Sequence, residues 1–135
     1  MKKPDHLNDI KDCFSGEKCK LGIPRSEIQA WKEKLLTTSD NPICLVSDWI
    51  IWDFDITDQD KQKYLDLGFL PTALFSHSII WDEQDRWPTG ACVKTTPLIK
   101  LIDGCIFQTK NTTYLLVENG QRTKITPEVF NSLHF

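Results

Sequence analysis

From residue 43 onward the chain is a succession of short β-branched and aromatic runs separated by turn residues, and this pattern limits the folds open to it. The first run, residues 43–54, suits a pleated sheet, with a bend near Ser47 and Asp48. Connections of hairpin length favour antiparallel pairing, including a tight turn at Asn119-Gly120. We expect an antiparallel sheet of about five or six strands. The later runs cover residues 70–81, 91–96, 104–109, 112–117 and 122–125.

Helix signals lie outside and between these runs. Ser26 with Gln29 forms the pattern of a capping box, while Thr57 and Thr126 are typical helix N-caps. We therefore expect an α+β fold in which two or three short helices pack on one face of the sheet. The expected helices cover residues 26–37, 58–67 and 127–133.

A chain of 135 residues fits one domain, 1–135, with residues 1–24 as a loosely ordered N-terminal arm. The basic start is not followed by the apolar stretch of a secretory signal, and no apolar run reaches the length of a membrane span. Five cysteines form an odd set without paired spacing, which favours reduced thiols. We expect a cytoplasmic protein with no membrane partner.

Acidic residues are concentrated in the middle of the chain. Residues 37–90 carry ten Asp or Glu against three Lys or Arg, a net −7, whereas the segments on either side each carry +2. Such a field disfavours direct binding of nucleic acid and favours a basic or nucleic-acid-handling protein surface. The alternative is an acidic surface that is only solvated.

The same segment holds eight of the fourteen aromatic residues. Trp49 and Trp52 are three apart, so on a regular strand they face opposite sides, and Trp87 lies beside Pro88 near a hairpin end. Exposed tryptophans with a charged rim are typical of binding hot spots, although an ordinary core also explains large residues. The expected partner-binding residues are Asp48, Trp52, Asp53, Asp55, Asp82, Glu83, Asp85 and Trp87.

A second interpretation gives the acids a catalytic role. Asp53 and Asp55 lie on the same face of a strand, where two carboxylates can hold magnesium in a small hydrolase or nuclease. Lys94 or Glu83 would complete that site. No phosphate loop, nucleophile elbow or zinc-type cysteine pairing accompanies them. The residues favour a non-enzymatic protein without cofactor or metal.

Two motifs stand out over residues 75–120. They are Trp81-x4-Arg86-Trp87-x2-Gly90-x2-Val93-Lys94-Thr95 and Gly104-x2-Phe107-x-Thr109-x-Asn111-Thr112-x-Tyr114-x-Leu116. These motifs resemble an uncharacterised bacterial and prophage family, a domain of unknown function that has no assigned catalytic residues. The resemblance implies small proteins encoded by phages and mobile elements that act in the cytoplasm of a bacterial host cell. Many such proteins disable host machinery such as CRISPR effector complexes.

Composition, charge and resemblance together lead to one leading hypothesis. The protein is expected to be a binding module of phage or prophage origin that inhibits a host defence complex, in the manner of an anti-CRISPR, through an acidic and aromatic surface. The metal-dependent hydrolase stays as one alternative. The other is a structural or regulatory homodimer formed through a β edge or a tryptophan patch.

Overall fold

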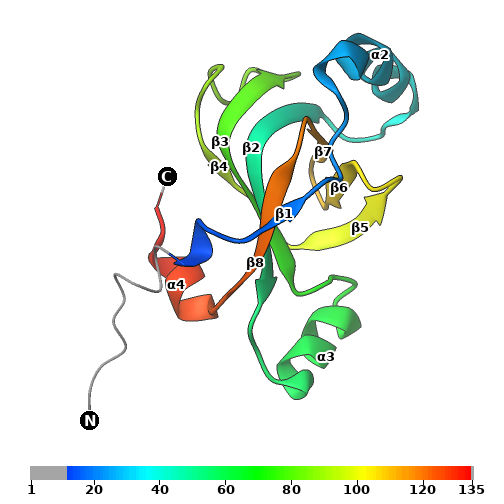
Figure 1. The fold of residues 1–135 in the computed structure, drawn as a ribbon. Helices are drawn as coiled ribbons and strands as arrows, with labels where there is room; N and C mark the ends of the chain where they lie inside the picture. The colour runs from blue at the N-terminus through cyan, green and yellow to red at the C-terminus, as the bar shows by residue number, and fades with distance from the viewer. Residues whose placement is uncertain (1–11, 135) are drawn as a thin grey trace.

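The computed structural model describes residues 12–134 and shows a twisted sheet with helices at its ends (Figure 1). Eight strands are formed by the described residues, in the order β1-β8-β2-β7-β6-β5, and β3 pairs with the other side of β2 and with β4. The α+β class is confirmed, but the sheet is mixed and has more strands than expected. The strands are β1 Glu17–Cys19, β2 Ile43–Phe54, β3 Thr72–Asp82, β4 Val93–Lys94, β5 Leu98–Ile102, β6 Ile106–Thr109, β7 Thr113–Leu116 and β8 Gly120–Ile125.

Strand β2 is the axis of the sheet. Its whole length pairs with β3 in antiparallel fashion, while its other edge is shared by β7 and β8, which both run parallel to it. β7 pairs with residues 43–46 and β8 with residues 50–54. The hairpin predicted at Asn119-Gly120 is therefore wrong: the chain continues in the same direction, and Glu118 takes the left-handed conformation (φ 60°) at the junction.

A break at Asp48 divides β2 into two halves, and this confirms the bend predicted near Ser47 and Asp48. Asp48 has φ 46°, which interrupts the two-residue alternation of the strand. Val46 and Trp49 consequently lie in one core cluster, inside the curved sheet, although they are three positions apart in the sequence. Trp52 lies in a second cluster on the opposite face. Both tryptophans are buried because each face of β2 has its own core.

The helices occupy three separate places around this sheet. α2 (Ile28–Thr38) packs through Leu35 on the outer face at the start of β2, and α4 (Pro127–Ser132) packs through Val129 on the outer face at its end. α3 (Asp58–Asp66) extends beyond the end of β2 at the bottom of Figure 1. The expectation that the helices pack on one face is met, because Tyr64 of α3 packs on the same outer-face cluster as Val129 of α4.

Two of the three predicted helix starts are confirmed. The side chains of Thr57 and Thr126 accept hydrogen bonds from the N–H groups of Asp60 and Val129. The capping box at Ser26 is not formed, because a 3₁₀ turn over Arg25–Glu27 (η1) precedes α2 and places Glu27 at its N-cap without a side-chain bond.

Part of the predicted N-terminal arm belongs to the sheet. β1 pairs with β8, Cys13 is buried, and Ile23 bridges Val117. The expectation of a loose arm is wrong for residues 12–24, and residues 1–11 lie outside the described residues. Helices in the described part of the chain are too short and too polar to cross a lipid bilayer.

Candidate functional site

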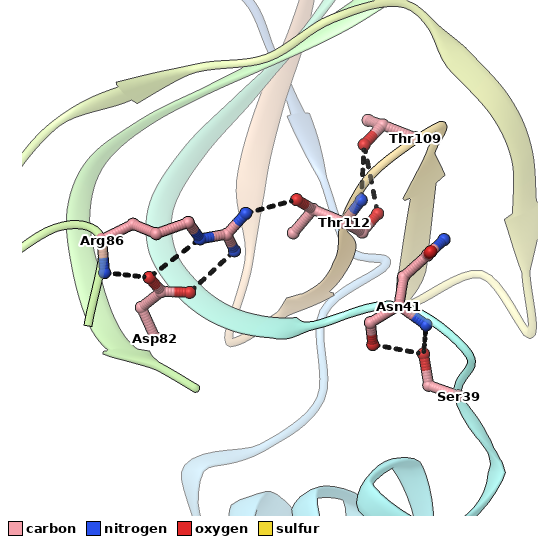
Figure 2. Close-up of polar contacts among 6 residues, drawn as sticks. All are labelled: Ser39, Asn41, Asp82, Arg86, Thr109 and Thr112. Atoms are coloured by element: carbon pink, nitrogen blue, oxygen red, sulfur yellow. Dashed lines mark hydrogen bonds and ion pairs between the residues drawn. The ribbon is translucent and has the colours of Figure 1, made fainter. Parts of the chain in front are cut away.

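Three chain segments meet at the end of the sheet where β2 begins (Figure 2), and hydrogen bonds between polar side chains join them. The segments are the β3–β4 connection, the loop between α2 and β2, and the β6–β7 turn. We call the joined side chains the polar network. Its members are Ser39, Asp82, Arg86, Gln108, Thr109, Thr112 and Thr113.

Asp82 and Arg86 form the centre of the polar network. Arg86 donates from Nη2 to Asp82 Oδ1 (2.8 Å) and from Nε to Oδ2 (3.1 Å), and its backbone N–H also donates to Oδ2 (2.6 Å). The Asp82 side chain has no exposed surface, and the Arg86 side chain is 27% exposed. A bidentate pair of this kind fixes the relative orientation of both groups. The last residue of β3 is thereby locked to the turn that follows it.

The electrostatics of this pair follow from its burial. Burial raises the pKa of Asp82, but the hydrogen bonds and charge of Arg86, together with a backbone N–H of Trp87, outweigh burial and lower the pKa below its ordinary value. Burial also raises the pKa of Cys44 to about 12, and the Asp82 charge acts in the same direction. Asp82 is therefore a structural carboxylate, held ionised by its partner rather than available to a ligand.

From Arg86 the network continues into the β6–β7 turn. Arg86 Nη1 donates to Thr112 Oγ1 (2.9 Å), and the Thr112 N–H donates to Thr109 Oγ1 (3.2 Å). Thr113 Oγ1 in turn donates to Gln108 Oε1 (2.7 Å) and lies 2.8 Å from Ser39 Oγ. Elements that are far apart in the sequence are thus cross-linked by side chains at this end of the molecule.

The polar network fixes the turn that follows β3, and this turn is at the surface of the molecule. Asp85 has φ 51° and donates from its N–H to Asp82 O (3.1 Å), while the Glu83 N–H donates to Ile43 O (2.9 Å). Glu83 and Asp85 are exposed, and within residues 12–134 neither carboxylate is in an ion pair. Trp87 is half-buried, with the Arg86 guanidinium 4.6 Å from its ring centre. We call Glu83, Asp85 and Trp87 the turn surface.

The other predicted binding residues lie elsewhere. Asp48 lines a polar cleft of about 540 Å³. Asp53 accepts from Arg122 at both carboxylate oxygens (2.7 and 3.0 Å) and from Thr72, and Asp55 is exposed beyond the end of β2. Trp52 is fully buried and donates to Cys13 O (2.6 Å). A role for Trp52 as a surface anchor is incompatible with this burial.

The predicted acids therefore do not form one group: apart from Asp48 at the break in β2, they lie at the two opposite ends of this strand. Asp82 is opposite Cys44 in the β2–β3 register, and Asp53 is opposite Thr72. These positions are nine steps apart on β2, up to about 30 Å along an extended strand. Glu83 and Asp85 stay with Asp82, whereas Asp55 stays with Asp53. The acidic middle of the sequence does not become one continuous surface.

The residues suggested for a metal-dependent hydrolase are engaged in other contacts. Asp53 is bound by Arg122, and the Lys94 ammonium donates to the carbonyls of Phe130 and Leu133 at the end of α4 (2.8 and 2.7 Å). Glu83 lies at the opposite end of β2. Over residues 12–134, no three His, Cys, Asp or Glu side chains form a group suited to a metal.

The polar network itself was not predicted as a unit. Asp82 and Arg86 are four apart in a turn, and Thr112 is 26 residues from Arg86, so only the fold brings them together. The two motifs of the family resemblance were the available signal, because Arg86 belongs to the first motif and Thr109 and Thr112 belong to the second. The Arg86 guanidinium also lies over the Trp87 ring, and Gly90 (φ 89°) and Gly104 (φ 74°) have left-handed backbone angles.

Comparison with known proteins places this end of the molecule within a defined family domain. The sequence model of a domain of unknown function (DUF6957) matches residues 21–132, which include the whole polar network and the turn surface. No curated protein and no solved structure shows significant similarity to the chain.

Proposed function

Starting from the fact that the chain belongs to the DUF6957 family, a domain of unknown function, we propose that it is a non-enzymatic protein-binding module. The turn surface is its docking site, and the partner presents a basic surface. The observation that carries this proposal is the pairing of two unneutralised carboxylates with a half-buried tryptophan on a turn fixed by the Asp82–Arg86 pair.

Rigidity favours this turn over the other acidic positions. A docking surface that is already ordered loses little conformational entropy when it binds, so more of the contact energy appears as affinity. Asp82 is bonded to both the backbone and the side chain of Arg86, which fixes the turn before any partner arrives. Asp53, in contrast, is already neutralised by Arg122.

Charge and chemistry define the partner. Glu83 and Asp85 attract a basic surface and accelerate its approach, and Trp87 supplies the kind of aromatic contact that dominates many interfaces. Surfaces that handle nucleic acid are basic, and we propose a partner of this class. The finer form of the proposal is inhibition of a host defence complex, in a protein of phage or prophage origin that acts inside the bacterial cell.

The test compares two charge-reversed variants of the full chain in affinity capture from a bacterial lysate. Glu83→Lys with Asp85→Lys removes the acidity of the turn surface and leaves Asp82 and Arg86 in place. The matched control is Asp55→Lys with Asp66→Lys, which changes the same number of exposed acids at the other end of the molecule. We expect the control to retain a basic partner that the turn variant loses.

Circular dichroism and thermal unfolding establish that both variants are folded. A basic partner retained by the turn variant and lost by the control would place the docking site at the far end of β2. A wild-type chain that captures no partner, or the same proteins with all three baits, would contradict the proposed function.

A further inference from the structure

A second concave region lies on the outer face of the sheet, between α2 and the β5–β6 hairpin. It is a groove of about 410 Å³, within the size range of small-molecule sites. Its apolar lining comes from α2, β5 and β6 through Leu35, Ile99, Ile102 and Ile106. Ile99 is 37% exposed, so this apolar surface is open to solvent rather than covered by the chain. We call this region the α2–β5 groove.

Three lysines from three different elements line the same groove. They are Lys34 on α2, Lys100 on β5 and Lys110 in the β6–β7 turn, and all three are exposed. No carboxylate among residues 12–134 forms an ion pair with any of them. Asp40 and Asp103 also line the groove, which leaves one positive charge in excess.

The C-terminal end of α2 also lies at this groove. The carbonyls at a helix C-terminus carry partial negative charge when they are unpaired. Here the hydroxyls of Thr37 and Thr38 donate to Lys34 O (2.9 and 2.8 Å), and the Ser39 N–H donates to Leu35 O (2.8 Å). The carbonyls of Lys34 and Leu35 therefore already accept hydrogen bonds beside the groove.

A neutral hydrogen-bonding group completes the lining. Asn41 lines the groove next to the polar network, and Figure 2 shows its side-chain amide apart from the backbone contacts that Ser39 makes with Asn41. Within the described part of the chain this amide makes no hydrogen bond. It offers a donor to an anionic group held among the lysines.

From these observations we propose that the α2–β5 groove binds a small organic anion with an apolar body, of the class of aliphatic carboxylates. The apolar body lies on Ile99, Ile102 and Ile106, and the anionic group lies near Lys100 and Lys110. This site is separate from the turn surface, because Glu83, Asp85 and Trp87 do not line the groove.

Octanoate, octylammonium and octanol are the probes for this proposal, since they share a chain and differ in charge. Each is titrated into ¹⁵N-labelled full-length protein, and amide shifts are followed by NMR. We expect saturable shifts with octanoate, centred on residues 99–110 and 35–41, and weaker binding of the other two. Octanol or octylammonium binding as tightly as octanoate, shifts centred elsewhere, or no saturable binding would overturn the proposal.

A pair of variants separates the groove lysines from general positive charge. Lys100→Glu with Lys110→Glu is expected to weaken octanoate binding about tenfold, because attraction becomes repulsion at the groove. Lys18→Glu with Lys20→Glu changes two exposed lysines that do not line it and is expected to leave octanoate binding unchanged. Equal effects in the two variants would exclude a specific role for the groove.

Discussion

At the scale of single residues, the Asp82–Arg86 pair connects more parts of the fold than any of the exposed acids does. The pair joins the end of β3 to the following turn, and through Thr112 it joins that turn to β6 and β7. A buried carboxylate is tolerated only while it is paired, so each partner makes the other necessary. The acid predicted as a partner contact is therefore the support for its neighbours Glu83 and Asp85.

Arg86→Met tests this support directly. The substitution keeps an apolar stem but leaves Asp82 buried without its charge partner, and we expect a loss of about 3 kcal/mol in the free energy of unfolding. Urea unfolding followed by tryptophan fluorescence measures it. Arg122→Met, at the more exposed pair with Asp53, is the comparison and is expected to lose about 1 kcal/mol or less. Equal losses in the two variants would argue against a special role for the Asp82 pair.

The lowered pKa of Asp82 also predicts a pH dependence. A carboxyl whose pKa is lower in the folded state contributes stability that is present above its unfolded pKa, near 4, and is lost as pH falls through its folded pKa. We expect the stability difference between wild type and Asp82→Asn to be constant from pH 7 to about 5 and to shrink below about 4. Urea unfolding at each pH measures it, and a difference unchanged at pH 3 would refute an ionised Asp82.

At the scale of elements, the break in β2 determines how the two faces of the sheet are used. Asp48 (φ 46°) shifts the alternation, so that Trp49 joins the inner core and Trp52 the outer one. Gly120 fits against the same place, because a Cβ there would come within 2.3 Å of the Trp49 backbone oxygen. The junction between β7 and β8 thus packs directly on the broken strand.

Asp48→Val is expected to destabilise the protein by about 1–2 kcal/mol relative to Asp48→Gly. A β-branched residue strongly disfavours a positive φ, whereas glycine adopts it readily. Side-chain contacts do not explain the difference, because Asp48 is exposed. Denaturant unfolding of the two variants supplies the comparison. If valine were as stable as glycine, β2 would not require its break at this position.

The sequence was sufficient to predict the elements that depend only on neighbouring residues in the chain. The β-branched run of β2 and the threonine caps of α3 and α4 are found as predicted. Gly120 was misinterpreted because glycine occurs both in tight turns and where two segments of the chain pack closely. The sequence suggested a turn, whereas in the structure the lack of a side chain lets the backbone of Gly120 pack closely against Trp49. β1 has no apolar alternation and exists through its pairing with β8, so nothing in its own residues indicated a strand.

In the candidate site too, some features could be predicted from the local sequence and others depend on residues far away in the chain. Glu83, Asp85 and Trp87 were predicted as binding residues and do lie together at the end of β3. The composition of residues 37–90 nevertheless could not reveal that Asp82 is buried or that Asp53 is neutralised by Arg122. Both facts depend on partners supplied by the fold, and Arg122 is 69 residues away in the chain.

At the scale of the whole molecule, β2 separates two ends with different properties. The polar network and the turn surface occupy the end where β2 begins, and Asp53, Asp55 and α3 occupy the end where it finishes. Net charge alone does not distinguish these ends, since each carries exposed acids. Rigidity and the presence of Trp87 distinguish them, and these properties place the proposed docking site at the turn surface.

Hydrogen–deuterium exchange of the full chain, free and bound to a basic partner obtained by capture, tests this placement most directly. The account predicts that binding slows amide exchange over residues 82–88 and leaves residues 53–60 unchanged, because the partner covers the turn surface and not the far end of β2. Protection of residues 53–60 with unchanged exchange over residues 82–88 would contradict it.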